Sequence, residues 1–176
     1  KYSISQSQYI LDYGCGQNQF VKLCRERGFS NSYGYDKHFS KLDANRISSS
    51  DYHNKTWDLI TLWGVLEHLT NPVELLGGLK KLLTKNGKIV FTTLYTESKI
   101  PYQYKPPEHT LYFTRESLCR LLERCGLIID TFSEYVTEQV SNVYLTILLR
   151  TVPINIETRS FIKCPSSLKF PQMRSF

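Results

Sequence analysis

The sequence predicts an α/β protein with a mainly parallel sheet flanked by helices and an antiparallel hairpin of strands at its C-terminal end. Short β-prone runs alternate with segments of helical periodicity from about residue 9 to residue 126. The last two β-prone runs follow each other without a helical pattern between them. Alternation favours parallel strands joined by helices, and the final pair favours a hairpin.

The first half of the chain contains three short apolar runs. Tyr9–Tyr13 and Ser32–Asp36 read as buried strands, and the helix expected over Asn18–Arg27 ends at Gly28. Trp57–Trp63 reads as a third strand. The segment before it is polar, and we expect a short helix near residues 41–45 and a short strand near residues 46–48.

The second half begins with a helix for which Asn71 is a suitable cap and Pro72 a suitable first residue. Its apolar face consists of Val73, Leu75, Leu76, Leu79, Leu82 and Leu83. We expect Lys85-Asn86-Gly87 to turn the chain into a strand over Lys88–Leu94. A Tyr- and Pro-rich loop then leads to Thr114, which caps a helix ending at Gly126. We expect residues 127–134 and 143–150 to form a closing pair of strands.

Length and composition indicate one globular domain over residues 1–150, followed by a C-terminal extension over residues 151–176 that we expect to be partly disordered. The chain has 41% hydrophobic and 22% charged residues, and no apolar run long enough to span a bilayer. The five cysteines include no CxxC pair, which favours a reduced, cytoplasmic setting. The net charge of +6 is modest, so nucleic acid is a less favoured partner that stays open.

A Gly-x-Gly turn follows the first strand and points to a nucleotide-like ligand. Gly14 and Gly16 let the chain turn sharply and let a ligand lie against the backbone. Asp36 ends the next strand, where a carboxylate can accept hydrogen bonds from two ribose hydroxyls. Asp12 would repel a pyrophosphate but suits a cation. S-adenosylmethionine, which carries a sulfonium, an ammonium and a ribose, fits both acids.

Five segments together resemble the class I S-adenosylmethionine-dependent methyltransferases, in the branch of the ubiquinone-biosynthesis O-methyltransferases. ILDYGCG at residues 10–16 resembles motif I, and YGYD at residues 33–36 resembles motif II. The segment from Trp57 to Pro72 contains the LEH sequence of that branch. NGKIV at residues 86–90 and the segment from His109 to Gly126 are similar to its later motifs. The resemblance implies a Rossmann-like methyltransferase fold.

The resemblance also implies roles for individual residues. Asp12, Gly14, Cys15 and Gly16 would line the methionine part of the cofactor, and Asp36 would hold the ribose. Lys37 or His38 would lie beside the adenine, Asp51 or Tyr52 would contact its edge, and Leu62 and Trp63 would lie under the cofactor.

Two departures from the family pattern stand out. Asn18 occupies the place of the third glycine of motif I, where it can adopt a left-handed backbone and cap the helix. The first strand also begins within about ten residues of Lys1, whereas family members usually carry helices before it. We expect either that such helices were cut off or that the acceptor half is incomplete.

His68 and His109 are the candidate bases for removing a proton from the acceptor, although each could instead be structural. No metal is expected, because Glu67 and His68 lack an obvious third ligand. Four tyrosines could form an aromatic acceptor wall or ordinary loop packing: Tyr95, Tyr102, Tyr104 and Tyr112.

These observations favour an enzyme that methylates a small molecule, most readily at oxygen. Two alternatives remain open at the level of sequence. One is an RNA or protein methyltransferase that docks through a basic surface, and the other is a cofactor-binding interaction module without catalysis.

Overall fold

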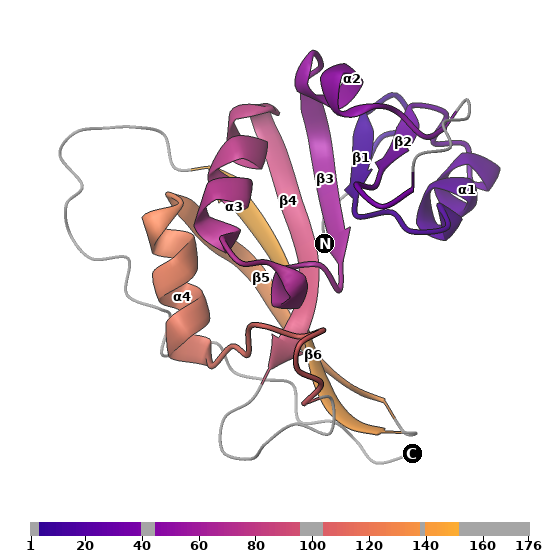
Figure 1. Ribbon diagram of the computed structural model, residues 1–176. Helices are drawn as coiled ribbons and strands as arrows, with labels where there is room; N and C mark the ends of the chain where they lie inside the picture. The colour runs from indigo at the N-terminus through magenta and orange to yellow at the C-terminus, as the bar shows by residue number, and fades with distance from the viewer. Residues whose placement is uncertain (1–3, 40–44, 96–103, 138–139, 152–176) are drawn as a thin grey trace, which may run out of the picture.

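The computed structural model describes residues 4–39, 45–95, 104–137 and 140–151, which form one sheet with helices packed against it (Figure 1). The described strands make a six-stranded sheet in the order β2-β1-β3-β4-β6-β5. The strands are β1 (Ile10–Tyr13), β2 (Ser32–Tyr35), β3 (Trp57–Trp63), β4 (Leu83–Tyr95), β5 (Leu127–Thr137) and β6 (Val140–Thr151). The helices are α1 (Gln19–Glu26), α2 (Ser49–His53), the 3-10 turn η1 (Leu66–His68), α3 (Pro72–Lys81) and α4 (Arg115–Arg124).

The sheet is parallel where the sequence alternates strands and helices. β1 pairs in parallel with β2 and β3, and β3 pairs in parallel with β4. β6 lies between β4 and β5 and is antiparallel to both. The predicted mainly parallel sheet is therefore confirmed. Residues 138–139, which join the last two strands, lie outside the described residues, so the hairpin itself stays a prediction.

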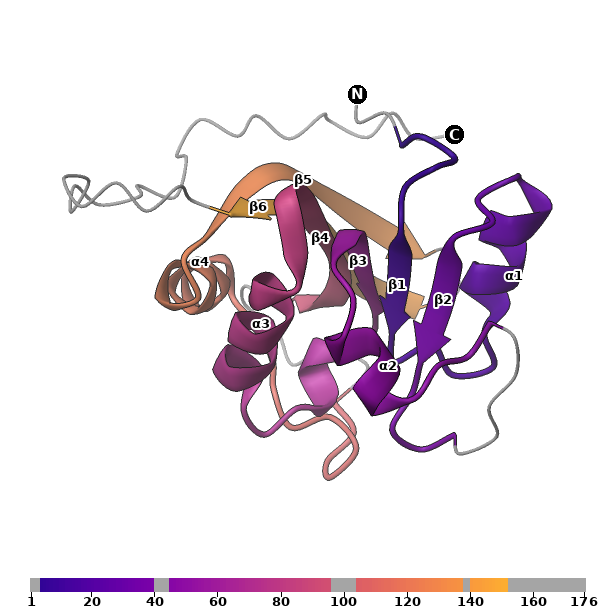
Figure 2. The same cartoon turned by 90° about the horizontal axis from the view of Figure 1, so that it is seen from above.

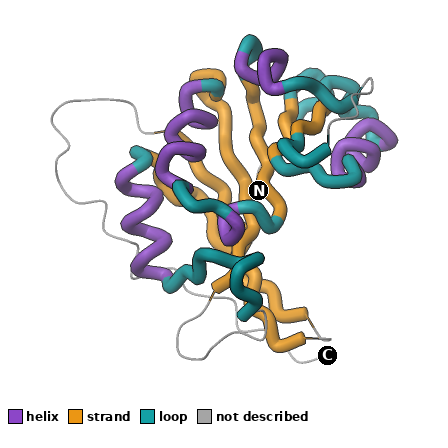
Figure 3. The backbone as a smooth tube through the Cα atoms, in the orientation of Figure 1, coloured by secondary structure: helices purple, strands orange, loops and turns teal. Residues whose placement is uncertain are grey.

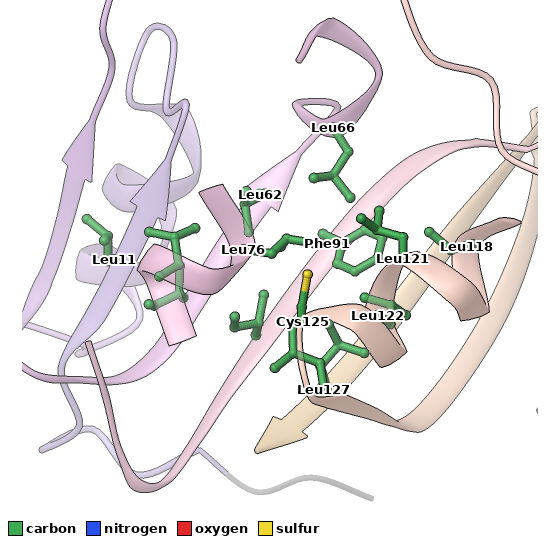
Figure 4. Packing of buried hydrophobic residues seen from close by; sticks show 14 of the residues in the cluster. Leu11, Leu62, Leu66, Leu76, Phe91, Leu118, Leu121, Leu122, Cys125 and Leu127 are labelled. Atoms are coloured by element: carbon green, nitrogen blue, oxygen red, sulfur yellow. The ribbon is translucent and has the colours of Figure 1, made fainter. Parts of the chain in front are cut away.

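The hydrophobic core lies between the sheet and helices α3 and α4, which cover the same face of it (Figure 2). Leu76 of α3 and Leu118 of α4 are almost completely buried there, beside Leu62 and Phe91 from the strands (Figure 4). The 3.6-residue period of both helices turns their leucines to this one face. Both helices also begin as the sequence predicts, because the side chains of Asn71 and Thr114 accept hydrogen bonds from the third helical N–H group.

The polar segment before β3 differs from the prediction. A short helix, α2, forms over Ser49–His53, and Ser48 and Asp51 form a capping box at its start. The predicted strand over residues 46–48 is reduced to a single bridge between Arg46 and Gly34. The Ser-rich sequence favoured a helix cap over a strand, because serine hydroxyls bond to nearby backbone N–H groups. The helix expected near residues 41–45 falls largely outside the described residues.

The turn predicted at Lys85-Asn86-Gly87 lies inside β4, as an irregular stretch of its ladder and not as a separate turn before the strand. β4 runs from Leu83 without a break, and its register against β3 shifts between the Trp57–Leu83 and Leu59–Lys88 pairs. A Cβ atom at Gly87 would lie 2.7 Å from the carbonyl oxygen of Trp57. Gly87 therefore allows the two backbones to approach closely, and the extra residues are absorbed by the irregular ladder.

No helix in the described ranges is long and apolar enough to cross a membrane. The extension expected over residues 151–176 lies, after Thr151, outside those ranges.

Candidate functional site

A cleft of about 740 Å³ opens at the carboxyl end of β1. It is bordered by the turn after β1, the first turn of α1 and the last residue of β3. Its lining consists of Asp12, Gly14, Cys15, Gly16, Gln17, Gln19, Phe20 and Trp63. Four predicted cofactor residues from motif I and Trp63 from the distant β3 are therefore brought to one cleft.

The glycine turn has a backbone that side chains would disturb. Gly14 has a φ of 78°, and a Cβ atom there would lie 2.6 Å from Cγ2 of Val65. Gly16 has a φ of 49°, but a Cβ atom there would meet nothing within 4 Å, so its Cα faces open space. The backbone carbonyl oxygen of Tyr35 holds the turn against β2, because it accepts hydrogen bonds from the N–H groups of Gly14 (2.7 Å) and Cys15 (3.1 Å).

Asn18 caps α1 only by its backbone. Its φ of 64° confirms the predicted left-handed conformation, but its side chain makes no capping hydrogen bond. The side chain is buried, and neither of its polar atoms has a partner within the described part of the chain. Asn18 is therefore the N-cap residue of α1, as predicted, although its side chain makes no capping bond and lies close to Gly34.

Asp12 places a buried carboxylate in the cleft. It is 2% exposed, and the hydroxyl of Thr61 donates a 2.7 Å hydrogen bond to its Oδ1 atom. Burial raises the pKa of Asp12 from 3.8 to about 6, the Thr61 hydrogen bond lowers it, and the nearby Asp36 raises it. A carboxylate whose charge is costly in this environment gains from a cationic ligand.

Asp36 lies at the end of β2, next to the glycine turn. Its carboxylate accepts hydrogen bonds from the N–H groups of Gly16 (2.9 Å) and His38 (2.8 Å). Lys37 borders a second groove of about 520 Å³, which runs between α2 and α3 and also includes Tyr52. The acid predicted to hold a ribose thus adjoins the turn predicted to hold the methionine.

Asp51 and Tyr52 lie on α2, and the structure gives them different surroundings. Asp51 is exposed, and its carboxylate accepts hydrogen bonds from the hydroxyl and N–H groups of Ser48, which lower its pKa. Tyr52 is buried against Tyr35, with ring centroids 4.5 Å apart. Asp51 is engaged in capping α2, so its suggested contact with the adenine edge stays a prediction.

Leu62 and Trp63 point to opposite faces of the sheet. Trp63 lines the cleft, is 38% exposed and lies edge-on to Phe20 at 5.1 Å between ring centroids. Leu62 is fully buried in the core beneath α3 (Figure 4). Neighbouring residues of a strand alternate between faces, so only the side chain of Trp63 reaches the cleft. The alternation predicts from sequence that the two side chains point to opposite faces, but not which of the two reaches the cleft.

His68 and His109 lie together, although 41 positions separate them in the chain. Their ring centroids are 4.8 Å apart, and Nδ1 of His68 lies 2.8 Å from the carbonyl oxygen of Glu108. The carbonyl oxygen of Glu67 accepts hydrogen bonds from the N–H groups of Thr110 and Leu111, which ties η1 to this loop. In Figure 3 the chain leaves β3, passes through η1 and reaches α3.

The expected aromatic wall is only partly described. Tyr104 and Tyr112 have ring centroids 5.4 Å apart, and Tyr112 lies 6.4 Å from His109. Tyr102 lies outside the described residues, as does the side chain of Tyr95. Among the described residues, no cluster of three or more His, Cys, Asp or Glu side chains could hold a metal ion.

Sequence reasoning missed three residues that shape the cleft. Thr61 holds Asp12, Gly34 lets β2 approach the glycine turn, and Arg46 donates a hydrogen bond to the carbonyl oxygen of Gly16. A Cβ atom at Gly34 would lie 2.7 Å from Sγ of Cys15. Gly34 was visible in motif II, but no local pattern signalled the other two, whose partners are distant in the chain.

The sequence of this chain is similar to those of known methyltransferases. The profile of a family described as a methyltransferase domain matches residues 2–131. Two curated relatives are a tRNA U34 carboxymethyltransferase of Colwellia psychrerythraea (27% identical over 149 residues) and a ubiquinone biosynthesis O-methyltransferase of Photobacterium profundum (32% over 107 residues). The matches cover 68% and 51% of this chain, but only 44% and 45% of those proteins, so the chain spans less than half of their length.

A solved structure with a similar fold is the 1,6-didemethyltoxoflavin-N1-methyltransferase of Burkholderia thailandensis, which holds 1,6-didemethyltoxoflavin and S-adenosylhomocysteine. Its TM-score is 0.68 at 15% identity, and the match covers 83% of this chain and 72% of that one. This likeness confirms the Rossmann-like methyltransferase fold that the motifs implied.

Proposed function

Because the chain belongs to the methyltransferase domain family, we propose that it transfers a methyl group from S-adenosylmethionine to an oxygen atom of a small-molecule acceptor. The observation that carries the proposal is the buried carboxylate of Asp12 in a cleft built on a glycine turn. The ubiquinone biosynthesis O-methyltransferase among its relatives supports oxygen as the methylated atom.

The residues of the cleft fit this cofactor in charge and in space. The space beside Gly16 leaves room for a ligand against the backbone. Asp12 offers its carboxylate to the cationic amino-acid part, and Asp36 offers a carboxylate to the ribose. Lys37, His38 and Tyr52 would lie on the adenine side, while Trp63 would form the wall at the methionine end.

Methyl transfer from a sulfonium requires little covalent participation by the protein. The bound cofactor supplies a methyl group on a sulfonium, which is electrophilic. The chain must hold the cofactor, exclude water and align the acceptor oxygen with the methyl carbon. Either His68 or His109 would take the single proton from the acceptor hydroxyl, and the two rings lie together beyond the carboxyl end of β3.

Calorimetric titration with S-adenosylmethionine tests the proposal. We expect a Kd in the micromolar range for the wild-type chain. Asp36→Ala should weaken binding at least tenfold, because a charge-assisted hydrogen bond to the ligand is lost. Asp130→Asn is a suitable control, because Asp130 pairs with Lys88 on β4 and lies outside the cleft lining. An absence of binding by the wild-type chain would overturn the proposal.

RNA is the second candidate substrate, and two observations favour it. One relative is a tRNA U34 carboxymethyltransferase, and the whole chain carries a net charge of +6. The same cofactor site would serve either substrate, so the two candidates differ in what docks beside it.

A further inference from the structure

We propose that Arg46 is a positioning residue that braces the glycine turn of the cleft from the outer side of β2. The inference rests on the proposed function only in naming S-adenosylmethionine as the ligand whose affinity Arg46 would set. The brace itself is a contact between Arg46 and the turn, and it can be tested without a ligand.

The backbone of Arg46 is anchored beside β2. The N–H group of Gly34 donates a 2.7 Å hydrogen bond to the carbonyl oxygen of Asn45, and the N–H group of Ile47 donates a 2.9 Å bond to the carbonyl oxygen of Gly34. Arg46 lies between these two bonds and forms a parallel bridge with Gly34. Its side chain therefore starts from a fixed point on the edge of the sheet.

The guanidinium group of Arg46 reaches the turn and is buried there. Nη2 donates a 2.5 Å hydrogen bond to the carbonyl oxygen of Gly16, and Arg46 is only 8% exposed. Its Cζ atom lies 5.0 Å from the ring centroid of Phe39. Burial raises the pKa of the Cys15 thiol, whereas a hydrogen bond from Arg46 and its charge lower that pKa. The guanidinium thus bonds to Gly16 of the cleft lining, and its charge also acts on the neighbouring Cys15 thiol.

Charged side chains hold Gly16 on both sides. Its N–H group donates to the carboxylate of Asp36, and its carbonyl oxygen accepts from Arg46. Gly16 has a φ of 49° and no side chain that could pack, so its orientation depends on hydrogen bonds to its backbone groups, which include a long contact of 3.9 Å from Sγ of Cys15 to its carbonyl oxygen. A planar guanidinium can bond to the carbonyl oxygen, reach the thiol and stack on an aromatic ring at once, which a lysine ammonium cannot.

A turn that is held in shape before the ligand arrives binds it without a further ordering cost. Removal of the brace should therefore weaken cofactor affinity although Arg46 is not part of the cleft lining. Arg46 would act on affinity only through the turn, whereas the carboxylates of Asp12 and Asp36 would touch the cofactor directly.

The test compares Arg46→Met with Arg25→Met. Arg25 is a matched control, because it donates a 2.9 Å hydrogen bond to the carbonyl oxygen of Ser32 and lies 6.0 Å from the ring of Tyr33, at the other end of β2. We expect Arg46→Met to raise the Kd for S-adenosylmethionine at least tenfold and Arg25→Met to change it less than twofold. Equal affinity of Arg46→Met and wild type, or equal losses in both variants, would overturn the inference.

A second readout separates positioning from general loss of structure. The pH midpoint for alkylation of Cys15, followed by peptide mass spectrometry, should rise in Arg46→Met while the midpoint for Cys125 stays constant. Low-millimolar guanidinium should restore part of the affinity of Arg46→Ala and none in Arg25→Ala. If Arg46→Met does not fold, Arg46→Lys is measured instead, with at least threefold weaker binding expected and unchanged binding contradicting the brace.

The two proposals fail in different ways. If the wild-type chain binds no S-adenosylmethionine, the proposed function is wrong. The pH midpoint for alkylation of Cys15 then becomes the test of whether Arg46 braces the turn. A Cys15 midpoint that does not move in Arg46→Met would show that the guanidinium does not act on the turn. If the wild-type chain binds and Arg46→Met binds equally well, only the inference fails.

Discussion

At the scale of single residues, the buried carboxylate of Asp12 has opposite effects on folding and on binding. Its carboxylate is 2% exposed, and burial raises its pKa from 3.8 to about 6. The folded state therefore takes up a proton between these two values more readily than the unfolded state. The stability that this group contributes is greatest below pH 4 and falls as the pH rises towards 6. At neutral pH the fold holds a charge that burial disfavours by roughly 3 kcal/mol.

We expect Asp12→Asn to stabilise the chain and to impair cofactor binding. Above pH 6 the free energy of unfolding should rise by about 1–3 kcal/mol, since the buried charge is removed and the Thr61 hydrogen bond can remain. Near pH 4 the gain should vanish. Urea denaturation at several pH values measures this change, and a variant less stable than wild type at pH 7.5 would contradict it.

Protonation of the same carboxylate should make the affinity for the cofactor depend on pH. Wild-type affinity for S-adenosylmethionine should fall as the pH drops through about 6, because protonation of Asp12 removes the negative charge. Titrations between pH 5 and 8 measure this, with Asp12→Asn as the control. The assignment would be lost if both proteins showed the same pH profile.

At the scale of elements, the glycines of α3 and of the turn after β1 have opposite roles. Gly77 lies inside α3, where a Cβ atom would meet nothing within 4 Å. A glycine in a helix interior costs about 1 kcal/mol relative to alanine. Gly14, in contrast, has a positive φ and lies against Val65. The helix tolerates a methyl group that the turn does not.

We expect Gly77→Ala to raise the free energy of unfolding by about 0.5–1 kcal/mol without changing cofactor affinity. Gly14→Ala should lower stability and weaken binding at least tenfold, because the added methyl group strains the backbone and displaces Val65. Urea denaturation and calorimetric titration of both variants measure these effects. Loss of stability in Gly77→Ala would show that α3 needs its glycine for close packing.

At the scale of the whole molecule, the open question is the acceptor. The cleft proposed for the cofactor is lined by residues between Asp12 and Trp63, whereas the proposed acceptor side would involve η1 and the loop that carries His109. The chain also spans less than half the length of its curated relatives. Methylation assays with a panel of acceptors test for an acceptor, and cofactor binding without methylation of any of them would favour an interaction module.

RNA binding at two salt concentrations distinguishes the two candidate substrates. If the acceptor is a small molecule, attraction to RNA through the net charge of +6 should be weak and should fall steeply between low and physiological salt. Fluorescence anisotropy with a labelled tRNA measures this attraction. Sub-micromolar affinity at physiological salt, together with transfer of labelled methyl groups to the RNA, would favour the RNA candidate.

The sequence determined the order of strands and helices, the glycine turn and the family. These features are written in short stretches of chain, where hydrophobic periodicity, caps and glycines act locally. Trp57–Trp63 forms β3 over the predicted range, and Thr114 caps α4 as expected. The family motifs also placed Asp12, Gly14 and Gly16 in one site because they are adjacent in the sequence.

Only the tertiary structure decided which distant side chains support that site. Thr61 bonds to Asp12 across 49 positions, and Arg46 bonds to Gly16 across 30. Such partners depend on the register between strands and on the face to which each residue points, and a one-residue slip would exchange them. For the same reason Leu62 entered the core while Trp63 reached the cleft. Local patterns therefore specify the glycine turn, and the packing of the sheet specifies which side chains from distant parts of the chain surround it.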